Sequence, residues 1–511
     1  MSSQGYLLAW DAGTASCRCL IADCEARQAA LTRDGVPTFR DEGVPGSLEF
    51  DPQQMWETFV RLTREAVGSV SPDQVLALSV TSFRDGMIFL DVEGGVLYAG
   101  TNRDARAVAQ GFEMAQQHGE TVYRVTGRWP LGTDGAAHLL WMRKFQPEDY
   151  DRVRKVLMVG DWLAYRLCGA FCSEPTGASS SLLFDVRERR WSTEVAEALE
   201  LPASIFPDVV PPGSVVGELG EDVAYQLGLK PGTPVVAGLA DTQAACLASG
   251  ALEDGDTVAV AGSTMPLQMT IDEPLMDPGH RTWTGAHALD GLWSLESSAG
   301  LAGVTYGWLW EAFGEGQSSD EGYAVLDTEA ESAPPGSAMA FLGPWIADHG
   351  RLQFPSRVGF LAPFPATLEP PLTRPKMARA VLENIAFALR GNLSQLEQIS
   401  GREAGSLTVC GGLSRSRVFN QMVADVTQVP VRVPAVHESS ALGAAMCAAR
   451  GVGIYRDLRD AVQGMCRWAE PVEPHQALRG TYRTLYRRWL KQYGMLLGRR
   501  RTSEGCSKQI S

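Results

Sequence analysis

The stretch LLAWDAGTASCRCLIAD, residues 7–23, decides how the rest of the chain is interpreted. An apolar run ends at an acid, Asp11, and a short turn of glycine, alanine and hydroxyl residues follows it. The chain then resumes as an alternating strand that ends at a second acid, Asp23. This pattern predicts a β-hairpin whose turn carries a carboxylate, a glycine and two hydroxyl side chains.

A similar pattern occurs in the second half of the chain. The stretch TVAVAGSTMPLQMTI, residues 257–271, is again an apolar strand, a glycine–hydroxyl turn and an apolar strand. Two such hairpins indicate an internal repeat in which each copy begins an α/β domain. At 511 residues the chain also exceeds what one core normally holds. We therefore expect domains at residues 1–245 and 246–495, followed by a flexible, basic tail at 496–511.

Segments outside the hairpins alternate between helices and strands. Apolar residues at helical spacing predict a helix at Pro52–Val67, and Val75–Phe83 reads as a buried strand. Lys230–Asp241 is a turn and a buried strand that ends at another acid. Residues 406–434 read as strand, glycine turn, helix and strand, which is the crossover that joins parallel strands. These elements predict the α/β class.

Composition narrows the function classes. The formal net charge of -15 argues against nucleic acid or an anionic membrane surface as the main partner. The chain has no run of about 18 uncharged apolar residues, and its start, MSSQGYLLAW, lacks the pattern of a signal peptide. The ten cysteines are scattered without CxxC pairs, which is typical of reduced core residues. We therefore expect a cytoplasmic protein.

The first turn has the residue types of an anion site. A glycine turn after a strand directs backbone N–H groups toward one point, and Gly13 permits close approach of a phosphate. Thr14 and Ser16 add hydroxyl donors, and Arg18 can reach an anion from the returning strand. Asp11 suits Mg²⁺ better than an anion. The turn thus predicts a metal–nucleotide site, with a plain polar hairpin as the alternative.

Three segments resemble the FGGY family of carbohydrate kinases, which belongs to the actin-like ATPase superfamily. DAGTASCRCLIAD is similar to that family's first phosphate loop, and VVAGLADTQAACLASG to the segment that holds its catalytic aspartate. CGGLSRSRVFNQMVADVTQVPV, followed by ESSALGAAMCA, is similar to its adenosine-binding signature. The similarity runs in order from about residue 6 to about residue 495, so it covers nearly the whole chain.

The resemblance implies two ribonuclease-H-like domains that close over ATP in an interdomain cleft. It assigns Mg²⁺ to Asp11 and makes Asp241 the general base that accepts the proton of the acceptor hydroxyl. The residues it assigns to ATP and its phosphates are Gly13, Thr14, Ser16, Arg18, Gly262, Ser263, Thr264, Gly411, Gly412 and Ser414. From the residues alone, Asp241 is also a good N-cap, and the pair Gly411–Gly412 also suits tight helix–strand packing.

Other segments bear on the acceptor. PGSLEFD, RDG, DARA, VYRVTG and DWLAYRL are most similar to the branch of the family that phosphorylates autoinducer-2. Arg84 and Asp85 stand where the glycerol branch has an Arg-Glu pair and the xylulose branch a Met-His pair. We expect them to hold acceptor hydroxyls, with a surface ion pair as the alternative. Asp104 and Arg106 resemble a substrate-side motif but also suit a helix start. The resemblance places Asp241 beside the acceptor too.

We therefore expect ATP-dependent phosphorylation of a small sugar, polyol or sugar-like molecule, with autoinducer-2 (dihydroxypentanedione) as one candidate. The alternatives are xylulokinase- or glycerol kinase-like activity, an actin-like ATPase without a sugar acceptor, and an inactive sugar-binding regulator. The second turn reads Gly-Ser-Thr where many members have Gly-Thr-Ser or Gly-Thr-Gly, and Ala240 replaces a common glycine. Both orders of residues in the second turn supply a glycine and a hydroxyl. The sequence does not decide between a monomer and a homodimer.

Overall fold

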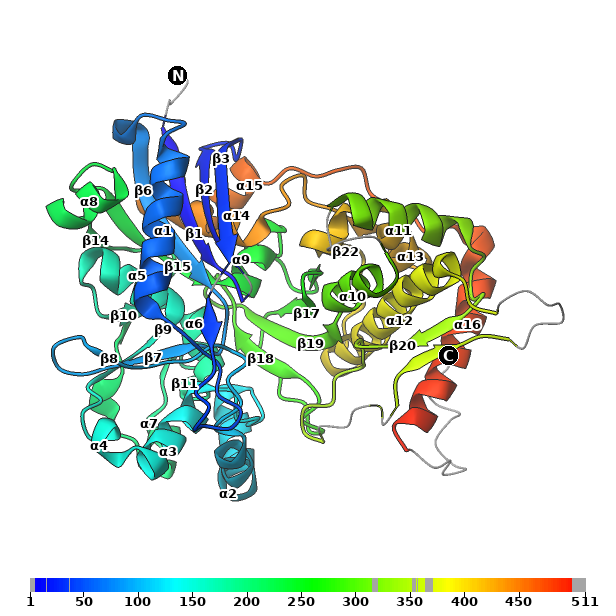
Figure 1. The fold of residues 1–511 in the computed structure, drawn as a ribbon, viewed down its shortest axis with the longest axis horizontal. Coiled ribbons are helices and arrows are strands. Elements are labelled where there is room, and N and C mark those ends of the chain that lie inside the picture. The colour runs from blue at the N-terminus through cyan, green and yellow to red at the C-terminus, as the bar shows by residue number, and fades with distance from the viewer. Residues whose placement is uncertain are drawn as a thin grey trace.

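The computed structural model describes residues 5–14, 16–35, 37–314, 320–351, 355, 357–363 and 371–498. The chain folds into two α/β lobes that lie side by side, each built around one six-stranded mixed sheet (Figure 1). From residue 499 on, the predicted tail lies outside the described residues.

The first sheet begins with the predicted hairpin. β1 (Tyr6–Ala12), β2 (Ser16–Asp23) and β3 (Gln28–Gly35) form an antiparallel meander. β6 (Val75–Ser82) lies parallel to β1, β15 (Pro234–Ala240) lies parallel to β6, and β14 (Val215–Glu218) closes the edge. The strand order is β14-β15-β6-β1-β2-β3.

The second sheet repeats this arrangement. Its strands are β16 (Thr257–Val260), β17 (Thr264–Ile271), β18 (Trp283–Ala286), β19 (Trp293–Leu301), β22 (Leu407–Cys410) and β23 (Val431–Arg432). The order β19-β17-β16-β22-β23 matches β3-β2-β1-β6-β15: three antiparallel strands, then two parallel ones. The predicted repeat and the two ribonuclease-H-like α/β domains are confirmed.

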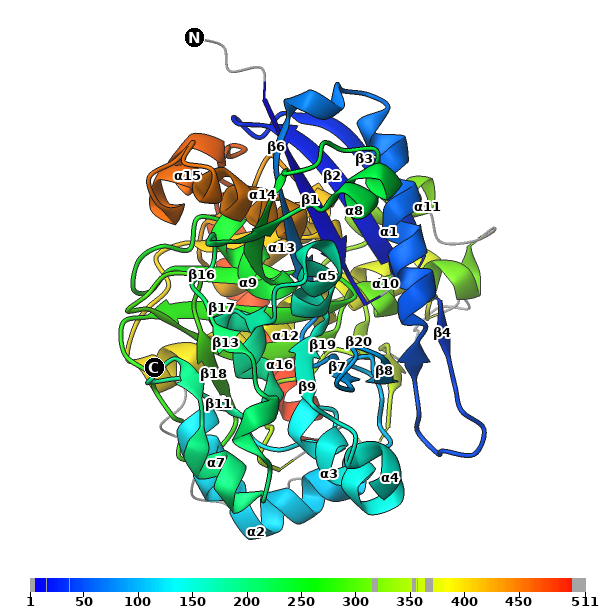
Figure 2. The same cartoon turned by 90° about the vertical axis from the view of Figure 1, so that its left-hand side faces the viewer.

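Helices cover both faces of the first sheet. α1 (Pro52–Val67), α5 (Val159–Cys168) and α8 (Glu221–Leu227) lie on one face, and α14 (Ser439–Gly451) lies on the other (Figures 1 and 2). Successive strand residues point to opposite faces, so Leu8 packs with α1 while Leu7 packs with α14. α14 thus completes the core of the first domain, although a division of the chain at residue 245 assigns it to the second.

The second sheet has one helical layer and one shared face. α10 (Gly303–Phe313), α12 (Arg374–Ser400), α13 (Arg417–Thr427) and α16 (Arg479–Leu496) enclose the larger core on one side. On the other side, α9 (Asp241–Ala248) contacts β16, β15 and α14, so it lies between the two sheets.

Residues 242–248 of α9 are all buried, as expected for a helix with protein on every side. Gly443 of α14 permits the close crossing, because a Cβ there would lie 2.2 Å from the carbonyl oxygen of Ala244. The helix that begins with Asp241 is therefore held by both domains.

A small separate core lies below the first sheet, under the sheet β8-β7-β9. The strands there are β7 (Met87–Leu90), β8 (Val96–Ala99) and β9 (Lys155–Met158), and the helices are α2 (Val108–Thr126), α3 (Gly135–Phe145), α4 (Pro147–Tyr150) and α7 (Thr193–Ala198) (Figure 2). The remaining elements are β4 (Thr38–Phe39), β5 (Glu49–Phe50), β10 (Cys172–Ser173), α6 (Pro175–Ala178), β11 (Phe184–Asp185), β12 (Arg190–Trp191), β13 (Asp208–Val209), α11 (Asp320–Ser332), β20 (Met339–Phe341), β21 (Gly359–Leu361) and α15 (Leu458–Met465).

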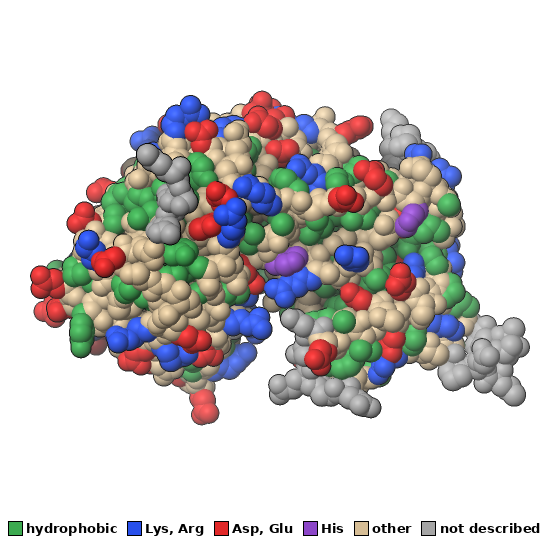
Figure 3. Space-filling model, turned by 90° about the horizontal axis from the view of Figure 1, so that it is seen from above, with side chains coloured by type: hydrophobic (Ala, Val, Ile, Leu, Met, Phe, Trp, Pro, Cys, Tyr) green, Lys and Arg blue, Asp and Glu red, His purple; other side chains and the backbone are tan. Residues whose placement is uncertain are grey.

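Charged side chains of both signs are interspersed over the face of the molecule that Figure 3 shows. In the part of the chain that the structure describes, no helix is both long and apolar enough to span a bilayer. The nine cysteines in that part are buried or half-buried.

Candidate active site

Three predicted site residues lie at the carboxyl ends of neighbouring parallel strands. β1 and β15 flank β6, and the register sets Asp11 and Ala240 beside consecutive residues at the end of β6. Arg84 lies two residues beyond the end of β6, and Asp241 directly follows β15. This is the edge of an α/β sheet at which ligands bind. Strand order therefore brings together the predicted metal ligand, an acceptor residue and the predicted base.

Of the two carboxylate oxygens of Asp11, one accepts a hydrogen bond and the other has no hydrogen-bond partner among the described residues. Oδ2 accepts a hydrogen bond from Arg18 Nη1 at 2.9 Å, while buried Oδ1 has no hydrogen-bond partner among the described residues. Burial raises the pKa of Asp11, and the nearby charge of Arg18 opposes that shift. Mg²⁺ is commonly held by one or two carboxylates, water and substrate phosphates. The lone Oδ1 fits such a shared site, and no cluster of three metal-ligating side chains occurs in the described ranges.

The first turn is closed by its own backbone. The Gly13 N–H donates to the Ser16 carbonyl at 3.0 Å, and a Cβ at Gly13 would lie 3.1 Å from that oxygen. Thr14 Oγ1 accepts a hydrogen bond from Asn102 Nδ2 at 3.1 Å, so a residue that the sequence did not single out orients this hydroxyl. Thr14 and Ser16 are half-buried.

Arg18 is more constrained than the sequence suggested. Besides Asp11, its Nε lies 3.4 Å from Glu438 Oε2, and 30% of its side chain is exposed. The guanidinium is thus held between two carboxylates, which leaves only part of it for a phosphate. Glu438 also lies 3.4 Å from Arg415 of the second domain, so it connects the two halves of the site.

The second turn and the glycine pair meet at the matching edge of the second sheet. The Ala261 N–H donates to the Cys410 carbonyl at 2.7 Å, which sets the turn Gly262–Thr264 beside Gly411–Gly412. Ser263 and Thr264 are exposed. The structure therefore brings together the residues predicted for phosphate and for adenosine in this domain.

The two glycines and Ser414 differ in their surroundings. Gly411 has a φ of 87°, and a Cβ there would lie 2.8 Å from the Ala261 carbonyl, so its packing alone requires glycine. A Cβ at Gly412 would meet nothing within 4 Å, so this position faces open space. Ser414 is buried and donates its hydroxyl to the Gly411 carbonyl at 2.7 Å, so it shapes the turn.

Asp241 is half-buried at the first position of α9. The N-cap itself is Ala240, so the expected N-cap role of Asp241 is wrong by one residue. Its Oδ1 accepts hydrogen bonds from the Thr242 N–H at 2.6 Å and the Thr242 hydroxyl at 3.2 Å. Burial raises the pKa of Asp241 to about 6; Arg84 opposes this shift and Asp11 adds to it. Such a carboxylate is ionised at neutral pH yet basic enough to accept a proton.

A buried hydrogen-bond chain supports the strand end that carries Asp241. The Ala240 N–H donates to Thr176 Oγ1 at 2.9 Å, and this hydroxyl donates to Glu174 Oε1 at 2.8 Å. Glu174 also accepts from the N–H groups of Thr176 and Gly177 at 2.7 and 2.5 Å. The chain fixes the direction in which β15 enters α9.

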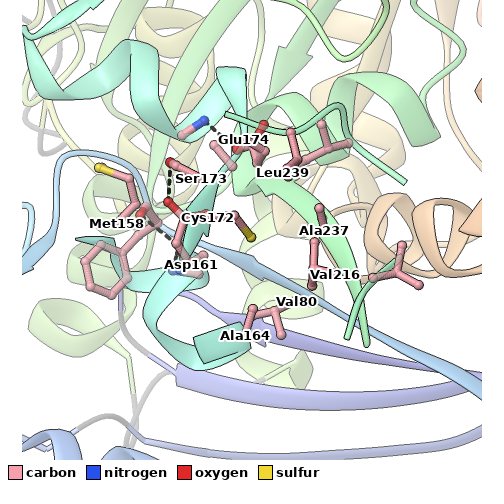
Figure 4. A pocket seen from close by; sticks show the side chains of 18 residues that line it. Val80, Met158, Asp161, Ala164, Cys172, Ser173, Glu174, Val216, Ala237 and Leu239 are labelled. Carbon is pink, nitrogen blue, oxygen red and sulfur yellow. Dashed lines mark hydrogen bonds between the residues drawn. The ribbon is translucent and has the colours of Figure 1, made fainter. Parts of the chain in front are cut away.

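Figure 4 shows Glu174 in the wall of a small cavity that Asp161 and Ser173 also line. The cavity has a volume of about 20 Å³, enough for one water molecule. Burial raises the pKa of Glu174 to about 7 and that of Asp161 well above its usual value. Ala240 also lines this cavity, so these acids lie next to the strand end that carries Asp241.

Arg84 and Asp85 do not pair with each other. Arg84 donates to Glu296 of the second domain from Nη1 at 2.5 Å and Nη2 at 2.9 Å. Asp85 has a φ of 69°, and its Oδ1 lies 2.8 Å from Arg128 Nη2. The alternative of a local surface ion pair is therefore wrong, and both side chains lie between the domains.

Asp104 requires a correction. It has no exposed surface, and its carboxylate binds the Arg106 guanidinium at 2.8 Å and the Tyr98 hydroxyl at 3.2 Å. Burial would raise its pKa, but contacts with His138 and Arg106 hold that pKa well below its usual range. A fully enclosed, fully paired carboxylate offers no surface to an acceptor. Asp104 anchors the loop after β8, and its predicted substrate role is wrong.

Sequence reasoning missed Asn102, Arg128, Glu296 and Glu438. A signal existed for Glu296, the lone acid within the otherwise apolar or small-residue stretch WSLESSAGL. Asn102, Arg128 and Glu438 carry no comparable local signal, because their importance comes from contacts with residues distant in sequence.

Comparison with known proteins agrees with this geometry. Residues 6–248 match the N-terminal domain model of the FGGY family of carbohydrate kinases, and residues 257–452 match the C-terminal domain model. Autoinducer-2 kinase of Escherichia coli K12 is 30% identical over 97% of this chain and 95% of its own length. Autoinducer-2 kinase of Salmonella paratyphi B is also 30% identical, over 96% and 94%.

Solved structures share the fold at lower identity. Xylulose kinase from Lactobacillus acidophilus has a TM-score of 0.84 at 20% identity, covering 96% of this chain and 98% of that one. Plasmodium falciparum glycerol kinase with ADP has a TM-score of 0.81 at 19% identity, with the same coverage. With both family domains matched in order and the strand-end residues converging between them, the chain belongs to the FGGY family of carbohydrate kinases, enzymes that use ATP.

Proposed function

We propose that this kinase transfers the γ-phosphoryl group of ATP to a hydroxyl of a small sugar-like acceptor, with Asp241 as general base. The observation that carries the proposal is the convergence of Asp11, Arg84 and Asp241 at one edge of the first sheet. Phosphoryl transfer requires positioned reactants and neutralised charge more than covalent chemistry. The three side chains provide a metal-binding carboxylate, a cation and a base.

Asp11 would hold Mg²⁺ through its unpartnered Oδ1, where the ion would neutralise charge on the terminal phosphates. The N–H groups of Gly13 and Gly262 are used within their turns, so the hydroxyls of Thr14, Ser263 and Thr264 are the donors that we propose for the phosphates. Gly412 offers open backbone to the adenosine. Asp241 Oδ1 is occupied by Thr242, so Oδ2 is the oxygen that takes the proton from the attacking hydroxyl.

Autoinducer-2 (dihydroxypentanedione) is the first acceptor we propose, because the 30% identical relatives are named autoinducer-2 kinases. Xylulose and glycerol are the alternatives, since kinases of both share the fold. A cytoplasmic location fits both an ATP-dependent reaction and the scattered cysteines of the sequence, which form no CxxC pairs.

The test is an ADP-release assay with ATP and Mg²⁺ across dihydroxypentanedione, pentuloses, linear polyols and glycerol. We expect ADP release to require an acceptor and kcat/KM to be highest for dihydroxypentanedione. A preference for xylulose or glycerol would replace that acceptor. ADP release that is equally fast with and without every acceptor would contradict sugar phosphorylation and favour an acceptor-free ATPase.

A further inference from the structure

Two ion pairs lie near Asp241 at the boundary between the domains, and the first of them spans it. The first joins Arg84, after β6, to Glu296 on β19, through two hydrogen bonds of 2.5 and 2.9 Å. Their side chains are 14% and 4% exposed, and Glu296 Oε2 also accepts from Gln268 Nε2 at 2.6 Å. Burial alone would raise the pKa of Glu296, but the charge and hydrogen bonds of Arg84 outweigh this effect and lower the pKa. The Glu296 carboxylate is therefore ionised. A bidentate, buried pair of this kind has a fixed geometry.

The second ion pair joins Asp85 to Arg128, and both residues belong to the first domain. The Arg128 guanidinium also contacts an aromatic ring of the second domain. The Arg128 guanidinium lies 2.8 Å from Asp85 Oδ1 and 4.1 Å from the ring centre of Trp283 on β18. A cation placed so close to an indole ring is attracted to it. The contact therefore holds Trp283 against the first domain.

His349 completes this group. Its ring stacks on Trp283 with centroids 4.0 Å apart and an interplanar angle of 15°. Burial lowers the pKa of His349 to about 4; Arg128 and Arg84 lower it too, and Glu296 opposes them. The imidazole is therefore neutral at physiological pH, with one donor and one acceptor nitrogen.

Two polar atoms of this group lack partners. Trp283 Nε1 and His349 Nε2 are buried, and neither has a hydrogen-bond partner among the described residues. Buried polar atoms in native proteins are nearly always paired. Two of them on stacked rings of the second domain, next to paired charges of the first, indicate a surface that receives a polar ligand.

We propose that Trp283 and His349 form the second-domain half of the acceptor site and that this site, with the nearby carboxylate of Glu296, selects an uncharged, hydroxyl- or carbonyl-bearing acceptor over a sugar acid. This inference rests on the proposed function and deepens it. The indole N–H donates to an acceptor oxygen, and the neutral imidazole pairs with a hydroxyl or a carbonyl.

The charges around the proposed acceptor site explain why a neutral acceptor would be preferred to a sugar acid. Each of the two cations in this group, Arg84 and Arg128, already has a carboxylate partner. An acceptor carboxylate would find neither of them unpaired and would face the carboxylates of Glu296, Asp85 and Asp241. Like charges brought together in a buried site repel each other and disfavour binding. Because the second-domain residues bind the acceptor only when the domains are together, acceptor binding also favours closure.

The test compares Trp283→Phe, which removes only the N–H, with Trp308→Phe on α10 as the control, since Trp308 is 43% exposed. Loss of one neutral hydrogen bond predicts a rise of up to about tenfold in acceptor KM for Trp283→Phe, with an unchanged ATP KM and melting temperature. Trp308→Phe should match the wild type. His349→Ala should raise acceptor KM in the same way. An unchanged acceptor KM in both site variants would overturn the proposal.

The charge selection is tested with a neutral polyol and the aldonic acid of the same carbon number. The wild type should favour the neutral acceptor by at least about tenfold in kcat/KM, and Glu296→Gln should narrow that ratio. Equal kcat/KM for both acceptors in the wild type would overturn the selection. A wild type that phosphorylates no acceptor would overturn the proposed function itself, whereas normal activity with unaltered variants would overturn only this inference.

Discussion

The pH dependence of the reaction follows from the surroundings of Asp241. Burial and the charge of Asp11 raise its pKa from 3.8 to about 6, against the opposing effect of Arg84. The base must be ionised to accept a proton, so activity falls as pH drops through 6. One pH unit below the pKa leaves about one-tenth of the groups ionised. We therefore expect kcat/KM at pH 5 to be about tenfold lower than at pH 7, whereas an aspartate of ordinary pKa would lose little.

The assay is ADP release at limiting acceptor and constant ionic strength between pH 5 and 8, because kcat/KM then reports the free enzyme. Near-ultraviolet circular dichroism at each pH verifies that the protein stays folded. The Thr242 hydroxyl helps to hold the pKa down, so Thr242→Val should move the acid limb to higher pH. Glu174, with a pKa of about 7, is another buried acid near this strand end, and Glu174→Gln should leave the limb near pH 6. A wild-type limb below pH 5 would refute the reasoning.

Three further substitutions test single contacts. Asp11→Asn removes the charge that would hold Mg²⁺, so the Mg²⁺ concentration needed for half-maximal rate should rise at least about tenfold; an unchanged Mg²⁺ requirement would rule out this role. Thr176→Val leaves the Ala240 N–H without its buried acceptor and should lower unfolding free energy by about 1–3 kcal/mol and reduce kcat. Thr176→Ser keeps the hydroxyl and should behave like the wild type; equal losses in both variants would disprove the hydrogen-bond explanation. Gly443→Ala places a Cβ 2.2 Å from the Ala244 carbonyl and should cost about 1–3 kcal/mol by chemical denaturation. Gly480→Ala, where a Cβ meets nothing within 4 Å, is its control, and similar stabilities of the two variants would contradict the close crossing of α9 and α14.

Local pattern predicted the framework well. Both hairpins and the helix Pro52–Val67 were identified from periodicity, because alternation and helical spacing report burial directly. The acid at the end of an apolar strand also pointed to Asp11. The family resemblance pointed to Asp241, for which the residues alone left helix capping open. These features depend on residues close together in sequence.

Contacts between residues far apart in the sequence could not be predicted from local sequence patterns. Arg84 and Glu296 are 212 residues apart, and nothing near either one indicates the other. Asp104 was misjudged for a different reason: Tyr98 and Arg106 are close to it in sequence, but only the folded loop after β8 turns their side chains toward its carboxylate. α14 packs on the first sheet although it lies in the second half of the chain, because helix packing follows the fold and not the order of residues.

The central claim is that Asp241 accepts the proton of the attacking hydroxyl between the two domains. Rapid-quench single turnover of Asp241→Asn with ATP, Mg²⁺ and acceptor tests it most directly, alongside calorimetric titration of the nucleotide. The account predicts that the nucleotide binds as in the wild type while phosphoryl transfer slows by about 10²–10⁴-fold. Transfer at a rate close to that of the wild type would contradict it.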